Sequence, residues 1–94
     1  MKDKVKEELL TLDLSTLSFQ ILCHLTFSER IFKPKDIAEE LGLNPASVRA
    51  RLSELRNKGL VVLDSNGYTS TVKPYDVLMK MREDLGNERR GARS

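Results

Sequence analysis

The short stretch Gly42-Leu43-Asn44-Pro45 constrains the fold of this chain more than any other feature of its sequence. Glycine often follows the last turn of a helix, where its backbone can adopt the left-handed conformation. Asparagine followed by proline is a typical helix start, because the Asn side chain caps free amides and proline has no amide to leave free. The sequence therefore predicts helices over about 34–41 and 45–58, joined by a turn short enough to hold them at a steep crossing.

Apolar residues recur at helical spacing in both segments, which gives each expected helix one buried side. Ala38 is small at the place where two crossing helices approach closely, and Leu43 and Val48 are expected to lock them together. The other residues expected on the two buried sides are Ile37, Leu41, Leu52 and Leu55.

The flanking segments predict further elements before and after this pair. Residues 2–12 have a narrow apolar stripe, and residues 17–27 have the spacing of a core helix that Ser15 or Ser18 can cap. Residues 60–72 then alternate in the manner of two strands, with Asn-Gly as their hairpin turn.

The last helix is expected over about 75–85, with Gly86 as its end, and residues 87–94 are expected to form a basic, flexible tail. The order is thus helix, helix, tight turn, helix, hairpin, helix. It predicts a single domain over residues 1–86 with a mostly helical α+β fold, in which N- and C-terminal helices are added to the helix pair and the hairpin.

Positive charge is concentrated on the second helix of the pair. The 94 residues have a formal net charge of only +2. Yet residues 45–58 contain one acidic residue, Glu54, against the four basic residues Arg49, Arg51, Arg56 and Lys58. A local bias of this kind is typical of a surface that binds a polyanion.

Small side chains occupy the side of this helix that lies opposite its buried residues. At ~100° per residue, that side holds Ala46, Ala50, Ser53 and Asn57, flanked by Ser47, Arg49, Glu54 and Arg56. Small residues let a helix enter a groove, and Arg and Ser at the edges can reach bases and phosphates. A helix that merely faces solvent would more often have long Glu and Lys side chains there.

The segment DIAEELGLNPASVRARLSELRNKGLV and the hairpin VLDSNGYTSTV together resemble the winged helix-turn-helix transcription regulators of the MarR or ArsR-like kind, including small examples from archaea and their viruses. The resemblance covers about residues 15–73. It implies a helix-turn-helix over about 34–58 and a wing over about 60–72. It also implies that the 45–58 helix is the recognition helix, which binds double-stranded DNA in the major groove.

Carried over position by position, the resemblance assigns DNA contacts to particular residues. Arg49 is the expected base contact, because a guanidinium pairs with guanine through two hydrogen bonds. Lys33 and Lys35 lie at the start of the preceding helix and are expected to bind the phosphate backbone of the DNA there. The other residues expected at base edges, at phosphates or elsewhere on the DNA are Asn44, Ala46, Ser47, Ala50, Arg51, Ser53, Arg56, Lys58 and, in the wing, Asn66.

The wing departs from the family pattern. Many members have Arg or Lys at the hairpin tip that enters the minor groove, whereas residues 60–72 contain neither. The wing is therefore expected either to touch phosphate through Ser, Thr or Asn or to make no contact, with the Arg-rich tail compensating.

Two apolar stripes outside the helix-turn-helix predict a homodimer, because exposed stripes of that size mark partner surfaces on a small protein. Packing them against a second copy would place the two 45–58 helices ~34 Å apart on a near-palindromic site. The alternative is that the two end helices pack on each other within one chain. The stripes consist of Val5, Leu9 and Leu12 in the first helix and Tyr75, Leu78, Met81 and Leu85 in the last.

Catalysis, metals and cofactors find no support in the sequence. Cys23 is the one cysteine and His24 the one histidine, and neighbours on a helix point ~100° apart, so these two cannot converge on one ion. We therefore expect neither an enzyme nor a cofactor. An intersubunit disulfide through Cys23 is the alternative to a plain core or surface role.

No apolar run approaches the ~18 to 20 residues that span a bilayer, and the N-terminus mixes both charge signs, unlike a secretory signal. We therefore expect no membrane partner and a cytoplasmic protein, in the host cytoplasm if the source is viral. Two other functions stay open from the sequence alone: a winged-helix module that binds only proteins, and RNA binding through the same basic face.

Overall fold

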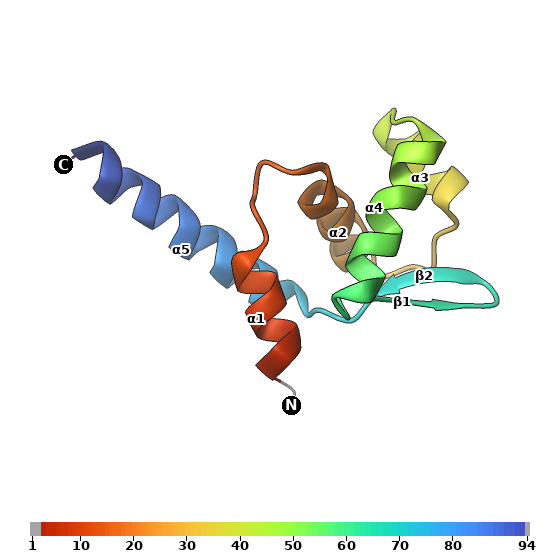
Figure 1. The fold of residues 1–94 in the computed structure, drawn as a ribbon, viewed down its shortest axis with the longest axis horizontal. Coiled ribbons are helices and arrows are strands. Elements are labelled where there is room, and N and C mark those ends of the chain that lie inside the picture. Colours follow the sequence, from red (N-terminus) through yellow and green to blue (C-terminus); the bar gives the residue numbers. More distant parts are fainter. Residues whose placement is uncertain (1–2, 94) are drawn as a thin grey trace.

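Residues 3–93 are described by the computed structural model, together with the side chains of residues 4–86. Within them the order of elements is α1 (Asp3–Thr11), α2 (Leu17–Ser28), α3 (Pro34–Leu41), α4 (Pro45–Asn57), β1 (Val61–Asp64), β2 (Gly67–Ser70) and α5 (Pro74–Arg93). Figure 1 shows α2, α3, α4 and the hairpin gathered at one end, while α5 extends to the other. The predicted α+β fold, mostly helical with a two-stranded hairpin, is confirmed.

α2 begins after Thr16, whose side-chain oxygen accepts a hydrogen bond from the Phe19 amide at 3.2 Å. The sequence pointed to Ser15 or Ser18 as the cap, and both have other roles. The Ser15 amide and hydroxyl donate to Asp13, and Ser18 is buried inside the first turn. Thr16 is therefore the residue that caps the helix.

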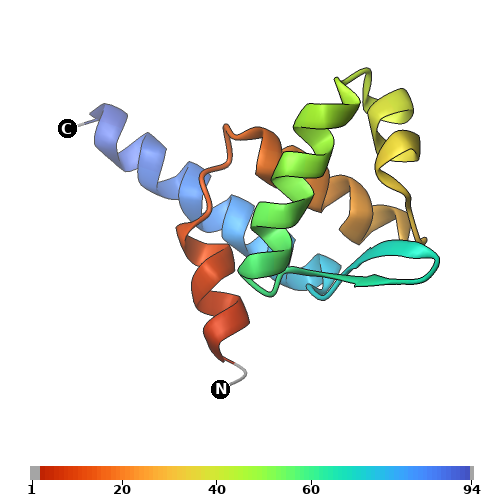
Figure 2. The same ribbon diagram turned by 45° about the vertical axis from the view of Figure 1, so that its right-hand side comes forward.

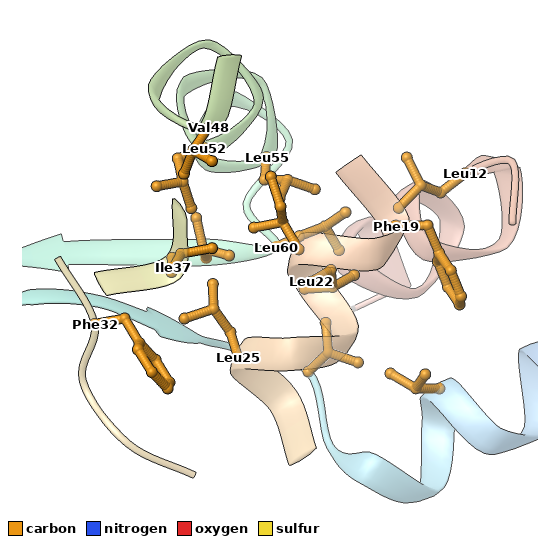
Figure 3. Packing of buried hydrophobic residues seen from close by; sticks show 14 of the residues in the cluster. Leu12, Phe19, Leu22, Leu25, Phe32, Ile37, Val48, Leu52, Leu55 and Leu60 are labelled. Carbon is orange, nitrogen blue, oxygen red and sulfur yellow. The ribbon is translucent and has the colours of Figure 1, made fainter. Parts of the chain in front are cut away.

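The core lies where α4 crosses α2 and α3. Val48, Leu52 and Leu55 of α4 are fully buried, at 0% exposure. Figure 3 shows their side chains directed toward the residues of α2, α3 and the segment after α4 that complete this core, among them Leu22, Leu25, Ile37 and Leu60. The predicted buried sides of both helices are confirmed, except that Leu41 at the end of α3 is only half-buried.

The hairpin is fixed by its turn and by a neighbouring residue. Asp64 Oδ1 accepts hydrogen bonds from the amides of Asn66 at 2.7 Å and Gly67 at 3.2 Å. Gly67 has a φ of 143°, and a Cβ there would collide with the backbone carbonyl of Phe32. Phe32 in turn exchanges two backbone hydrogen bonds with Tyr68, at 2.9 and 2.7 Å. The hairpin is therefore held against the core by the segment that leads into α3.

The prediction that α1 offers a free apolar stripe is wrong. Leu9 and Leu12 are buried within the chain, at 3% and 5% exposure, and Val5 is half-buried. α1 packs against the first half of α5, as both views of the ribbon show (Figures 1 and 2). The apolar side of α1 is therefore buried within the chain, which agrees with the alternative that the two end helices pack on each other.

α5 is attached to this packing through a buried lysine. Val77 and Lys80 face inward at 0% and 1% exposure. The Lys80 ammonium donates to the Leu10 carbonyl at 3.0 Å and to Asp84 Oδ2 at 2.7 Å. A buried ammonium is tolerated when hydrogen bonds and a counter-charge replace its water. These bonds fix the direction in which α5 leaves the core.

α5 continues beyond its predicted end. The helix was expected to stop at Leu85 before Gly86, with a flexible tail from residue 87, but it runs through Gly86 to Arg93; Ser94 lies outside the described residues. The continued helix contains two glycines, Gly86 and Gly91, and each costs only about 1 kcal/mol relative to alanine. The residue types that follow, among them Glu, Arg and Ala, are good helix formers and outweigh that cost.

Replacing Gly86 tests this finding. Gly86→Ala should increase the free energy of unfolding by up to ~1 kcal/mol, because the new Cβ meets nothing within 4 Å and alanine favours the helix. Gly42→Ala is the matched control. Its Cβ would also be unobstructed, but φ is +67°, so the free energy of unfolding should fall by ~1 to 2 kcal/mol. Urea unfolding followed by circular dichroism measures both; a destabilised Gly86→Ala variant would contradict the continuous helix.

Candidate nucleic-acid interface

The turn between α3 and α4 forms as its residues predict. Gly42 adopts the left-handed conformation and ends α3, and the Leu43 amide donates to the Ala38 carbonyl at 2.8 Å. Asn44 Oδ1 then accepts hydrogen bonds from the amides of Ala46 at 2.8 Å and Ser47 at 3.3 Å, which caps α4. The two helices form a helix-turn-helix, and the Gly42 conformation and the Asn44 cap fix the turn between them. The Oδ1 atom of Asn44 is occupied by this cap.

The outer side of α4, which lies opposite its buried residues, is exposed. α4 lies in front of α2 in both ribbon views, with one side packed on the core and the other free (Figures 1 and 2). Ala46, Ala50 and Ser53, which the sequence placed opposite the buried residues, are all exposed. Ala46 and Ala50 line a surface depression of about 430 Å³ together with Ser47, Arg51 and Leu17, which lies at the start of α2. The face is thus shallow and free of long side chains at its centre.

The two flanks of this face differ in charge. Arg49 and Arg56 lie on one flank, seven residues apart and therefore almost in line, and both are exposed. On the other flank, Glu54 Oε1 is 3.4 Å from Arg51 Nη1, and Glu54 Oε2 is 3.9 Å from Lys58 Nζ. Among the described side chains, Arg49 and Arg56 form no such pair. The structure therefore separates the four predicted cations of α4 into two open and two paired ones.

Lys33, which directly precedes α3, and Lys35 in its first turn are both exposed. The first turn of α3 is not an open anion site, however. The Lys33 amide donates to Asp36 Oδ2 at 3.3 Å, so a carboxylate already occupies the N-terminal amide. Any contact that α3 makes to a phosphate therefore depends on the two lysine side chains.

The tip of the wing presents Asn66, which is exposed, and no cation. Val62 and Leu63 on β1 are 49% and 41% exposed, so the outer part of the wing is apolar rather than basic. In Figure 1 the hairpin projects to the side away from α1 and α5. The folded wing therefore presents no Arg or Lys within residues 60–72, in contrast to the family pattern.

A polar network that the sequence did not reveal braces α3 against α2. Glu40 Oε1 lies 2.9 Å from His24 Nε2, and Glu40 Oε2 lies 3.2 Å from Arg30 Nη2. Both partners also contact Phe32: the Arg30 guanidinium is 4.5 Å from the ring centroid, and the His24 ring is 5.1 Å from it. Because Glu40 is 16 residues from His24 and 10 from Arg30, no local pattern marks this network.

Neither a metal site nor a reactive thiol is visible in the part of the chain that the structure describes. No group of three or more His, Cys, Asp or Glu side chains among these residues is placed to hold a metal ion. Cys23 is half-buried, and burial raises the pKa of its thiol, which keeps it protonated at neutral pH. No helix within residues 3–93 is long and apolar enough to cross a membrane.

Comparison with known proteins identifies this region. Residues 33–62 match a family model described as winged helix-turn-helix DNA-binding; they comprise α3, α4 and the first residues of the hairpin. No curated protein and no solved structure matches the chain. The family match agrees with the resemblance drawn from the sequence and with the fold. Residues 33–62 are thus similar to winged helix-turn-helix DNA-binding domains, and the structure has the helix-turn-helix and the hairpin of that fold.

Proposed function

We propose that this protein binds double-stranded DNA sequence-specifically, with α4 in the major groove, and that it regulates transcription. The observation that supports this most is the outer side of α4, where small exposed residues are flanked by cations. The major groove is ~12 Å wide and admits an α-helix whose exposed side chains reach base edges. A helix with Ala46 and Ala50 at its centre can approach the bases closely.

The proposed contacts divide into base and phosphate contacts. Arg49 lies beside the small residues near the start of α4 and is the proposed contact to a guanine, with Ser47 on the opposite edge. Arg56, Lys33 and Lys35 are exposed cations farther from the centre of the face and are the proposed phosphate contacts. A binding role of this kind requires no catalytic group and no cofactor, and we propose that the protein acts in the cytoplasm.

The two competing functions fit the surface less well. The deep, narrow major groove of an RNA helix excludes side chains, so the small-residue face of α4 would have nothing to contact there. A module that binds only proteins would be expected to expose apolar side chains at the centre of its contact surface. The outer side of α4 has alanine, serine and arginine instead.

We further propose a homodimer that forms through α5. Tyr75, Leu78 and Leu85 are 68%, 54% and 51% exposed, and their spacing of three and seven residues is that of the contact positions in a coiled coil. Next to Leu85, the connection between α1 and α2 borders a surface depression of about 590 Å³. Met81, which the sequence placed in the same stripe, is half-buried toward the core. The dimer contact is thus proposed for α5 and not for α1.

Replacing Arg49 tests the proposed base contact. Arg49→Ala should weaken binding to the preferred site by ~1 to 3 kcal/mol and relax the preference at one base pair, because a guanidinium–guanine pair is lost. Arg56→Ala is the matched control on the same flank and should weaken binding to preferred and random duplexes alike. Titration of both duplexes at one salt concentration measures the difference. Equal losses for Arg49→Ala on the two duplexes would contradict a base contact.

A charge placed in the α5 stripe tests the dimer. Leu78→Glu should convert a dimer into a monomer, because a carboxylate would be buried against an apolar partner surface. Leu63→Glu is the matched control, since Leu63 is also exposed, at 41%, but lies in the wing. Sedimentation at micromolar concentration gives the masses. A monomeric wild type, or a Leu78→Glu variant that stays dimeric, would contradict the α5 contact.

A further inference from the structure

The single acidic residue of α4 lies in the middle of the proposed DNA-contacting helix. Glu54 is four residues after Ala50, so the two side chains are only ~40° apart around the helix axis. Arg51 and Lys58, its ion-pair partners, lie farther toward the flank. The carboxylate therefore points in nearly the same direction as the small residues. It would come close to the DNA phosphates when that face of α4 binds DNA.

The arrangement makes the two flanks of α4 electrostatically unequal. One flank has the open cations Arg49 and Arg56. On the other flank, Glu54 is within 3.4 Å of Arg51 and 3.9 Å of Lys58, so three charged groups have a net charge of only +1. Ion pairs this exposed contribute little to stability, since their side chains keep 33–43% of their surface in solvent. Folding therefore does not explain why a carboxylate lies in this position.

We propose that Glu54 acts as a built-in counter-anion on α4 that lowers the affinity of this helix for DNA phosphates. It competes with phosphate for Arg51 and Lys58 and so weakens binding to any duplex, whatever its sequence. At a given protein concentration, occupancy of a duplex then requires the additional base contact proposed for Arg49 on the opposite flank. This inference rests on the proposed DNA binding by α4 and adds to it the residue that suppresses non-specific binding.

Counterion release gives the size of the expected effect. Each phosphate that a protein neutralises contributes ~0.9 to the slope of log K against log salt concentration. Glu54→Gln raises the net charge of the Arg51–Lys58 flank by one and should steepen this slope by ~0.9. If variant and wild type bind equally at 1 M salt, that change corresponds to about fivefold tighter binding at 0.15 M.

The test measures binding of wild type and Glu54→Gln to a random-sequence duplex over a range of salt concentrations. Glu7→Gln is the matched control, because Glu7 is exposed on α1 and the substitution changes the net charge of the chain equally. We expect a steeper slope for Glu54→Gln and an unchanged slope for Glu7→Gln. On a duplex selected from a random pool, Glu54→Gln should gain by the same factor as on random duplex, because the competition for Arg51 and Lys58 does not depend on base sequence.

Three results would overturn the inference. An unchanged slope for Glu54→Gln would show that the carboxylate does not compete with phosphate. Weaker binding to the selected duplex, with a new preference at one base pair, would show that Glu54 contacts a base such as cytosine. Equal steepening in Glu7→Gln would assign the effect to overall charge. Wild type that shows no salt-dependent binding would instead refute the proposed function itself. Glu54→Ala, with circular dichroism as a check of folding, repeats the test with a second side chain.

Discussion

The packing of one side of α4 on α2 and α3 is the constraint on which the rest of the structure depends. Val48, Leu52 and Leu55 are removed completely from solvent, so rotation of α4 about its axis would expose them at a cost of ~1.5 kcal/mol or more for each. The orientation of every other side chain on α4 follows from this. The small residues face outward, and the cations are divided between two flanks.

The parts of the fold that local chemistry decides could be predicted from the sequence. Gly42 and Asn44 set the end of α3 and the start of α4, because each has a conformational or capping property that few residues share. Asn66-Gly67 also marked the place of the hairpin, but the two turn residues are Ser65 and Asn66, and Gly67 is the first residue of β2, paired with Asp64. The end of α5 could not be predicted as safely, because an isolated glycine is only a weak obstacle among good helix formers. Whether the helix continues through Gly86 depends on the sum of the small helix propensities of many residues.

The outward face of the candidate site could also be predicted, since helical geometry alone places Ala46, Ala50 and Ser53 opposite the core. The interactions between distant segments could not. The contacts of Glu40 with α2, the burial of Leu9 against the rest of the chain and the buried ammonium of Lys80 all depend on how the elements meet in three dimensions. They correct the view that both end helices are free, and they leave the exposed stripe of α5 as the surface proposed for a second copy.

Selection of bound duplexes from a random pool by the full chain tests the central claim most directly, because it detects binding and reveals the preferred site in one measurement. If the outer side of α4 contacts base edges, the pool should converge on a site that contains a guanine. Pairing through α5 adds a second, inverted half-site about one helical turn away, ~34 Å or 10 base pairs. A single half-site without symmetry would refute the dimer and leave base recognition intact. A pool that stays random through repeated selection would contradict sequence-specific binding by α4.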